Sequence, residues 1–258
     1  MTATQTAALD LLNACEPGQT AVFLDFDGVL VALAELPNAI VVAPSLAGLM
    51  ADLDAATQGA MSIVSGRELR DLRRYLPDAP ASAIGSHGAE RALSGAPVWT
   101  HPAIGSPTVA EVQTRVEGLL RLSGGILIER KPTGAVAHYR QVPEAEAELE
   151  SACVQIAAAF PGYECHAAKC AFELRPDDVG KAKAVAWAME HPAFLGRTPV
   201  YMGDDATDEP ALAWVQDNGG LAVKVGEGDS VAHQRLAGPQ DVHALLASWI
   251  TARAEGRS

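Results

Sequence analysis

The sequence has few basic residues, no long hydrophobic run and no basic N-terminal segment. Its 19 lysine and arginine residues stand against 32 aspartate and glutamate residues, giving a net charge of −13. Without a basic face, binding to nucleic acid or to an anionic membrane is disfavoured. No apolar stretch reaches the roughly 18 residues of a membrane span, and the first residues lack the pattern of a signal peptide. We therefore expect a soluble, cytoplasmic protein.

Paired cysteine motifs are missing as well. The four cysteines show neither CxxC spacing nor a His/Cys metal pattern: Cys15, Cys153, Cys165 and Cys170. We predict four reduced thiols. Low-complexity linkers and repeats of fixed period are also absent. The chain does have 258 residues, 48% of them hydrophobic, which is enough for one large domain or a domain with a substantial insertion.

Short apolar runs alternate with helical patterns at both ends of the chain. The predicted strands lie at 21–24, 60–64, 81–85, 199–202 and 221–225. The predicted helices lie at 5–14, 46–53, 69–76, 180–190 and 241–253. Another helix is expected after strand 199–202, with Pro210 in its first turn and Asp208 as its cap. This alternation predicts an α/β fold, with a parallel sheet covered by helices on both faces.

The pattern changes in the middle of the chain. The expected elements are a helix from Pro107, strands 125–131 and 135–141, a helix from Pro143, and strands 163–167 and 170–175. The order helix, hairpin, helix, hairpin is that of a separate α+β unit. We therefore predict a small domain of about 99–177 inserted into a larger one.

Three predicted core strands end in polar residues. Asp25 and Asp27 follow the first strand, Ser65-Gly66-Arg67 follows the second, and Gly203-Asp204-Asp205-Ala206-Thr207-Asp208-Glu209 follows strand 199–202. In an open α/β sheet, chemistry lies beyond the carboxyl ends of the strands. Aspartates without histidine partners form an oxygen site suited to Mg²⁺, and such a cluster is unfavourable without a cation. Mg²⁺ is therefore implied.

These residue types suit phosphoryl transfer. Asp25 can attack phosphorus and form an acyl phosphate, and Asp27 can protonate the leaving oxygen and later activate water. Ser65 offers a hydroxyl to the phosphate, and Lys181 can neutralise its oxygens. Two alternatives stay open: Ser65 as a helix cap and Lys181 as a solvated helix lysine.

The motifs also carry a family resemblance. Taken in order, Asp25-Phe26-Asp27-Gly28, Ser65-Gly66-Arg67, Lys181 and Gly203-Asp204-Asp205 resemble the four motifs of the haloacid dehalogenase superfamily. Other segments are similar to its trehalose-6-phosphate phosphatases: Gly85-Ser86-His87-Gly88-Ala89-Glu90, Glu129-Arg130-Lys131, His138-Tyr139-Arg140 and Glu173-Leu174-Arg175-Pro176. The resemblance covers about residues 20 to 250.

This resemblance implies a Rossmann-like core at 1–98 and 178–258 with an α+β cap domain at 99–177. It implies a Mg²⁺-dependent phosphatase that acts on a sugar phosphate, trehalose 6-phosphate, and a functional link to a trehalose-6-phosphate synthase. The implied metal ligands are Asp25, Asp27, Asp204 and Asp205. The implied catalytic residues are Asp25, Asp27, Ser65 and Lys181. The implied substrate-binding residues are Gly66, Arg67, His87, Glu129, Lys131, Glu173 and Arg175.

Two positions depart from the family pattern. Val29 stands where the family usually has threonine, and Ala182 replaces a glycine after the motif lysine. Glu173 and Arg175 could also form a plain ion pair. Three other functions stay open: the same chemistry on another disaccharide or glucosyl-polyol phosphate, a phosphomutase, and a catalytically inactive sugar-phosphate-binding regulator.

Overall fold

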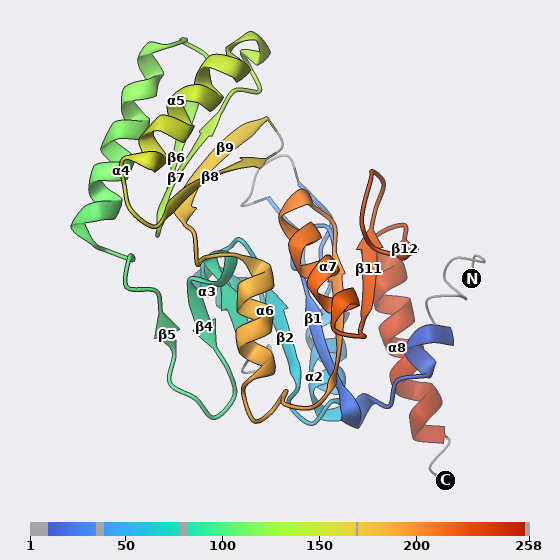
Figure 1. The fold of residues 1–258 in the computed structure, drawn as a ribbon. Coiled ribbons are helices and arrows are strands. Elements are labelled where there is room, and N and C mark those ends of the chain that lie inside the picture. The colour runs from blue at the N-terminus through green and yellow to red at the C-terminus, as the bar shows by residue number, and fades with distance from the viewer. Residues whose placement is uncertain (1–9, 35–38, 78–81, 169, 256–258) are drawn as a thin grey trace. The chain divides into compact units, whose positions relative to one another are not determined.

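The computed structural model describes residues 10–34, 39–77, 82–168 and 170–255. They belong to two compact units, drawn in Figure 1. We call Met1–Val98 with Lys181–Ser258 the large unit, and Trp99–Gly180 the inserted unit. The predicted α/β class is confirmed.

The large unit alternates strands and helices along the chain. Its strands are β1 (Thr20–Leu24), β2 (Met61–Val64), β3 (Ala83–Gly85), β4 (Glu90–Ala92), β10 (Thr198–Gly203), β11 (Leu221–Val225) and β12 (Gln234–Leu236). Its helices are α2 (Ser45–Ala56), α3 (Leu69–Tyr75), α6 (Lys181–Met189), α7 (Glu209–Asp217) and α8 (Pro239–Glu255). Short 3₁₀ turns are η1 (Pro17–Gln19), η2 (Ser86–Gly88) and η5 (Ala206–Asp208).

The strands of this unit form one sheet with the order β12-β11-β10-β1-β2-β3-β4. The short strand β5 (Trp99–Thr100) lies at the start of the inserted unit. Neighbours from β12 to β3 are parallel, whereas β3 and β4 are antiparallel. The chain continues from β1 to β2 on one side, while β10 lies on the other side. This reversal makes the carboxyl ends of β1 and β10 the place where such sheets bind ligands.

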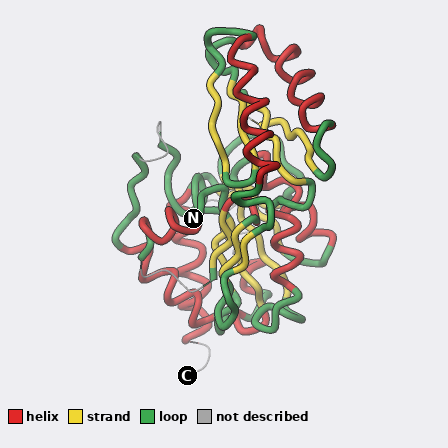
Figure 2. Tube along the Cα trace, turned by 90° about the vertical axis from the view of Figure 1, so that its left-hand side faces the viewer, coloured by secondary structure: helices red, strands yellow, loops and turns green. Residues whose placement is uncertain are grey.

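Both faces of the sheet are covered by helices, as the strand layer between helices in Figure 2 shows. Alternate residues of each buried strand enter different cores because successive side chains point to opposite faces. Val22 and Leu24 pack in a core with α2, α3 and α8, whereas Ala21 and Phe23 pack in a core with α6 and α7. This explains why the strands are apolar throughout.

The inserted unit is an α+β sandwich of its own. Its elements are α4 (Pro107–Glu117), η3 (Gly118–Arg121), β6 (Leu127–Lys131), β7 (Gly134–His138), η4 (Pro143–Ala145), α5 (Glu146–Ala158), β8 (Tyr163–Ala168) and β9 (Ala171–Pro176). The antiparallel sheet has the order β6-β7-β9-β8. Its core joins side chains of α4 and α5 to one face of the sheet, and the other face carries polar residues.

Several predicted bounds differ from the structure. The predicted helix 5–14 lies partly outside the described residues, and helix is seen at 10–13. The helix from Pro107 ends at Glu117 and continues as η3. Strands β4, β5 and β12 were not predicted, because runs of two or three residues are too short to show a period.

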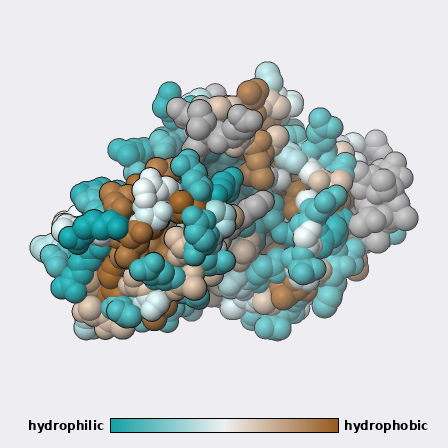
Figure 3. Space-filling view, turned by 90° about the horizontal axis from the view of Figure 1, so that it is seen from above, coloured by the Kyte–Doolittle hydropathy of each residue, from teal (hydrophilic) through white to brown (hydrophobic). Residues whose placement is uncertain are grey.

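The surface agrees with the charge of the sequence. Hydrophilic residues cover much of the face in Figure 3, with bands of hydrophobic residues between them. None of the four cysteines forms a disulfide, as predicted. Within the described part of the chain, no helix combines the length and apolar character needed to cross a membrane.

Candidate active site

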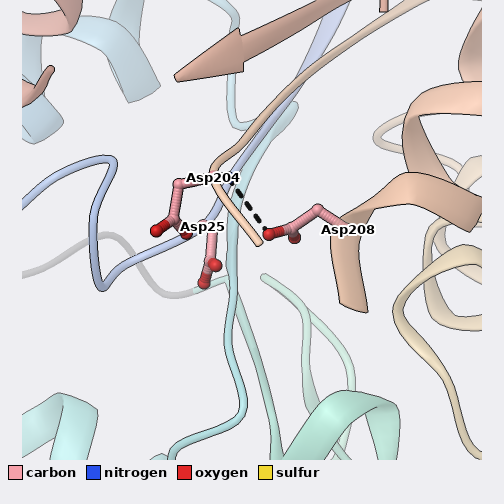
Figure 4. A group of neighbouring side chains, drawn as sticks. All are labelled: Asp25, Asp204 and Asp208. Atoms are coloured by element: carbon pink, nitrogen blue, oxygen red, sulfur yellow. Dashed lines mark hydrogen bonds between the residues drawn. The ribbon is translucent and has the colours of Figure 1, made fainter. Parts of the chain in front are cut away.

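Three aspartates meet where β1 and β10 end. Asp25 directly follows β1, Asp204 directly follows β10, and Asp208 ends η5, just before α7. One carboxylate oxygen from each lies within 4.8 Å of the others, as Figure 4 shows. Because β1 and β10 are parallel neighbours, their carboxyl ends bring together aspartates that are far apart in the sequence.

A glycine lets the two aspartate loops approach each other. Gly28 has φ of +75°, a conformation that favours glycine. A Cβ at this position would lie 2.0 Å from Oδ2 of Asp204. The Asp204 carboxylate therefore occupies the space that any side chain at position 28 would need.

Lys181 is the cation of this cluster. Its Nζ donates to Oδ2 of Asp25 and to Oδ1 of Asp208, at 2.7 Å in each case. The lysine is 4% exposed, so the alternative of a solvated helix lysine is wrong. The first residue of α6 thus reaches both acidic loops.

The pKa values show where positive charge is lacking. Burial raises the pKa of Asp25 well above its ordinary value, and the charge of Asp208 adds to this rise. Burial and Asp208 also raise the pKa of Asp204 to about 6. The charge of Lys181 keeps the pKa of Asp208 low despite its burial. Lys181 contacts two of the three converging carboxylates, so the cluster as a whole is short of positive charge.

A divalent cation fits this donor set. Carboxylate oxygens are the ligands that Mg²⁺ prefers, and a cation would relieve the repulsion that raises the two pKa values. Asp25 and Asp204 offer oxygens for it. Asp208 is less available, because Lys181 and the Tyr201 hydroxyl donate to its Oδ1.

Asp205 and Asp208 both accept hydrogen bonds from the backbone of the loop after β10. The carboxylate of Asp205 accepts from the backbone N–H of Ala206 at 2.6 Å and caps η5. Oδ2 of Asp208 accepts from the backbone N–H groups of Asp204 and Asp205. Asp208 therefore braces the loop, whereas the sequence had offered it as the side-chain cap of α7, which it does not form. Asp205 lies outside the group of three converging aspartates.

Asp27 forms an ion pair with Arg67. Nε of Arg67 donates to Oδ2 of Asp27 at 2.6 Å, and Nη2 donates to Oδ1 at 2.7 Å. The pair is partly buried, with 13% of the Arg67 side chain and 29% of the Asp27 side chain exposed. The hydrogen bond to Asp27 raises the pKa of Arg67. The structure thus joins two residues for which the sequence suggested different roles.

The turn after β3 supports the loop after β2. The backbone N–H of His87 donates to the carbonyl of Ser65, and that of Ser86 donates to the carbonyl of Arg67. The imidazole of His87 lies against Gly66, where a Cβ would be 2.6 Å from Nε2. Ser65 itself does not cap α3, because Glu68 holds that position; its Oγ accepts from the N–H of Arg67.

In the inserted unit, polar groups gather on the helix-free face of the sheet. Glu129 and Lys131 alternate with Ile128, which packs toward the core, so they share the opposite face. Nζ of Lys131 donates to Glu129 at 2.5 Å, and His138 of β7 lies 3.2 Å from the other oxygen. The His138 hydrogen bond, with help from Lys131, lowers the pKa of Glu129 to about 2.

Glu173 and Arg175 share this face on β9. Phe172 and Leu174 enter the core, so the charged residues between and after them point away from it. Nη1 of Arg175 donates to Glu173, and Nε donates to the carbonyl of Val179 at 3.1 Å. Both side chains are about nine-tenths buried. The ion pair that the sequence left open is present.

Sequence reasoning missed several supporting residues. Tyr201 was assigned only to an apolar strand, yet its hydroxyl donates to Asp208 at 2.6 Å. Lys224 was placed only within the predicted strand 221–225; it is buried and donates to the carbonyl of Asp204. Glu90 accepts from the Ser86 hydroxyl at 2.7 Å. A polar residue inside an otherwise apolar strand was the available signal for Tyr201 and Lys224.

The valine at position 29, where the family usually has threonine, has a structural explanation. Its side chain is fully buried in the core cluster that contains Phe26 and Leu30. An apolar side chain suits this place better than a hydroxyl, which would need a hydrogen-bond partner there.

Comparison with known proteins identifies the family of this arrangement. The family model described as trehalose-phosphatase matches residues 23–240. A trehalose-6-phosphate phosphatase of Escherichia coli K12 is 32% identical over 236 residues, covering 91% of this chain and 88% of the relative. A probable trehalose-phosphate phosphatase of Sinorhizobium fredii is 34% identical over 207 residues, covering 80% of this chain and 77% of the relative.

A solved structure shares the fold. The C-terminal domain of Candida albicans trehalose-6-phosphate phosphatase superposes with a TM-score of 0.80 at 21% identity, and the match covers 96% of each chain. At this identity the likeness concerns the fold. The sequence matches and the fold therefore point to the same group of proteins.

Proposed function

Because the chain belongs to the trehalose-phosphatase family, we propose that it hydrolyses trehalose 6-phosphate to trehalose and inorganic phosphate in a Mg²⁺-dependent reaction. The observation that carries this proposal is the meeting of Asp25 and Asp204 beside Lys181, within one buried cluster. A nucleophile, a candidate cation site and a fixed ammonium group are what phosphoryl transfer needs.

Asp25 is the nucleophile of the proposed reaction. One of its oxygens attacks phosphorus and forms an aspartyl-phosphate, while Asp27 gives a proton to the leaving sugar oxygen. Asp27 then takes a proton from the water that hydrolyses the acyl phosphate. Lys181 stays ionised because Asp25 and Asp208 flank it, and it holds the Asp25 carboxylate in place.

Asp25 and Asp204 would hold Mg²⁺ by their side chains, and the backbone carbonyl of Asp27 is the third protein ligand we propose. The ion would supply charge neutralisation for the phosphoryl oxygens. Asp205 remains a weaker candidate, because its carboxylate caps η5.

Sugar recognition belongs, in this proposal, to the inserted unit, acting as a cap domain. Glu129 and Lys131 offer a paired carboxylate and ammonium group on an open sheet face, which suits the hydroxyl groups of a sugar. Glu173 and Arg175 add a second pair on the same face. Buried hydroxyl-binding groups would reject ligands that leave them unpaired.

The substrate chemistry also suggests a partner reaction. A disaccharide phosphate must be made by transfer of a glucosyl group to a sugar phosphate. We therefore place a trehalose-6-phosphate synthase before this enzyme, with both in the cytoplasm.

The test is phosphate release from trehalose 6-phosphate, glucose 6-phosphate, sucrose 6-phosphate and a glucosyl-glycerol phosphate, each with Mg²⁺ and with a chelator. We expect kcat/KM for trehalose 6-phosphate to exceed the others by at least about 10-fold, since one or two specific polar contacts contribute this much. Chelation should abolish turnover. Similar rates on all four esters would contradict the trehalose assignment, and no phosphate from any of them would favour the inactive regulator.

A further inference from the structure

Both oxygens of the Asp27 carboxylate are held by one side chain. Arg67 grips them through Nε and Nη2 at 2.6 and 2.7 Å, the two-point geometry in which a guanidinium matches a carboxylate. This contact fixes the rotation of the carboxylate as well as its position. A single lysine-type contact would fix only its position.

Arg67 is itself fixed from several directions. The centre of its guanidinium lies 5.2 Å from the ring of Tyr75 and 5.8 Å from the ring of Phe26. Its backbone N–H donates to Oγ of Ser65, and its carbonyl accepts from Ser86. Phe26, the residue before Asp27 in the sequence, is fully buried in the core. Because its ring lies against Arg67, it helps to hold in place the residue that pairs with Asp27.

The proposed reaction depends on the direction of the Asp27 carboxyl group. In the first step, Asp25 oxygen bonds to phosphorus and the bond from phosphorus to the sugar oxygen breaks. The electron pair of that bond stays on the sugar oxygen, which takes the proton of Asp27. A general acid must lie within hydrogen-bond reach of the oxygen that it protonates.

We propose that Arg67 is a positioning residue that acts through Asp27, and not a ligand of the sugar as its motif suggested. The Nε and Nη2 donors that bind Asp27 form one of the two edges at which a guanidinium can hold a pair of oxygens. This inference rests on the proposed phosphatase function and assigns a role within its site.

The experiment is a double-mutant cycle of Arg67→Gln and Asp27→Asn in the full chain with Mg²⁺. General acid–base catalysis contributes about 10²- to 10⁴-fold, so loss of its positioning should lower kcat/KM for trehalose 6-phosphate about 10- to 100-fold. If Arg67 acts through Asp27, adding Arg67→Gln to Asp27→Asn should cost less than about 2-fold more.

A second substrate separates positioning from sugar binding. The p-nitrophenolate ion leaves without a proton at neutral pH, and kcat/KM covers only the steps up to the phosphoenzyme. Arg67→Gln should therefore keep kcat/KM for p-nitrophenyl phosphate within about 3-fold of wild type. Binding of trehalose 6-phosphate, measured by calorimetry in an Asp25→Asn background, should keep its Kd within the same factor.

Arg70→Gln is the matched control. Arg70 also makes a two-point pair, with Glu68, but 77% of its side chain is exposed. Its loss should leave all rates unchanged. Arg67→Lys keeps the charge and loses the fork, so it should recover only part of the rate. A thermal melt of each variant checks folding, and if Arg67→Gln is unfolded, the cycle is run with Arg67→Lys.

Additive losses in the cycle, or weaker binding of trehalose 6-phosphate to the Arg67 variant, would overturn the positioning role. Failure of the proposed function looks different, because wild type itself would then release no phosphate from trehalose 6-phosphate. In that event the cycle is run with whichever sugar phosphate wild type hydrolyses. A wild type inactive on every sugar phosphate would overturn both proposals.

Discussion

The acidic cluster of the large unit and the Glu129–Lys131 pair of the inserted unit differ in how far they are exposed. In the large unit, Asp25 and Lys181 are each 4% exposed and lie among other charges. In the inserted unit, 47% of the Glu129 side chain and 28% of the Lys131 side chain are exposed. The first arrangement fixes a few groups at high electrostatic cost, whereas the second leaves its groups accessible to a solute.

This contrast suggests a division of labour. Charges inside a protein interact strongly and tolerate little change, which suits groups that must stabilise a reacting phosphate. The Glu129–Lys131 pair is partly exposed, so a ligand can reach it and exchange hydrogen-bond partners with it. We expect changes in the large unit to affect turnover of every substrate, and changes in the inserted unit to affect the choice of sugar.

The largest expected effect is that of Asp25→Asn. An amide cannot form the acyl phosphate, so phosphate release should fall at least about 10⁴-fold, as when a nucleophile is removed from other enzymes. The loss should be the same for trehalose 6-phosphate and p-nitrophenyl phosphate. Asp52→Asn, at an exposed position of α2, is the control and should keep full activity. Activity surviving in Asp25→Asn would rule out the covalent route.

Lys181→Met comes next and combines two measurements. Removing one partner of a buried ion pair typically costs about 3–5 kcal/mol, so urea unfolding without metal should show a loss of this order. Phosphate release should fall roughly 100-fold or more on both substrates, because a fixed donor to the reacting centre is lost. Lys183→Met, at an exposed position of the same helix, should change neither quantity. If Lys181→Met were as resistant to urea as wild type, the buried cluster would tolerate the loss of its lysine as an exposed ion pair does.

The family resemblance read from the sequence is confirmed, and so is the α/β fold. These features depend on local patterns: Ala21–Leu24 is apolar at strand length, and Asp25-Phe26-Asp27-Gly28 follows it directly. The positive φ of Gly28 is likewise a property of one turn, so a local sequence pattern can indicate it. The roles of the individual site residues remain predictions.

What the sequence could not indicate are partners far along the chain. The contact of Asp27 with Arg67 spans 40 positions, and that of Asp25 with Lys181 spans 156. The first arises because the parallel strands β1 and β2 end at one edge of the sheet, and the second because α6 begins at that edge. Spacing within a motif says nothing about such contacts, so neither pair could be predicted from the sequence.

Lys131→Met tests the inserted unit. A hydrogen bond to a charged group contributes about 1.5–3 kcal/mol, so KM for trehalose 6-phosphate should rise at least about 10-fold with a smaller change in kcat. For p-nitrophenyl phosphate, which has no sugar, kcat/KM should stay unchanged. Arg130→Met is the control, because Arg130 alternates with Lys131 along β6 and pairs with Glu117 of α4. Equal losses on both substrates would contradict a role in sugar recognition.

The smallest expected effect is a pH dependence of opposite sign in the two units. The pKa of Asp204 is raised to about 6 by burial and by Asp208, so in metal-free protein its ionised form destabilises the fold above that pH. The destabilisation is relieved as the pH falls through 6 toward the ordinary 3.8. The pKa of Glu129 is lowered to about 2, chiefly by His138, so its contribution to the stability of the fold is present above pH 4.5 and is lost below that pH.

Urea unfolding in chelator should show wild type gaining roughly 1 kcal/mol over Asp204→Asn between pH 7.5 and 5.5. Against Glu129→Gln, wild type should lose stability as the pH falls below 4.5. A wild type that loses stability relative to Asp204→Asn on acidification would mean that this aspartate already has its positive partner in the protein.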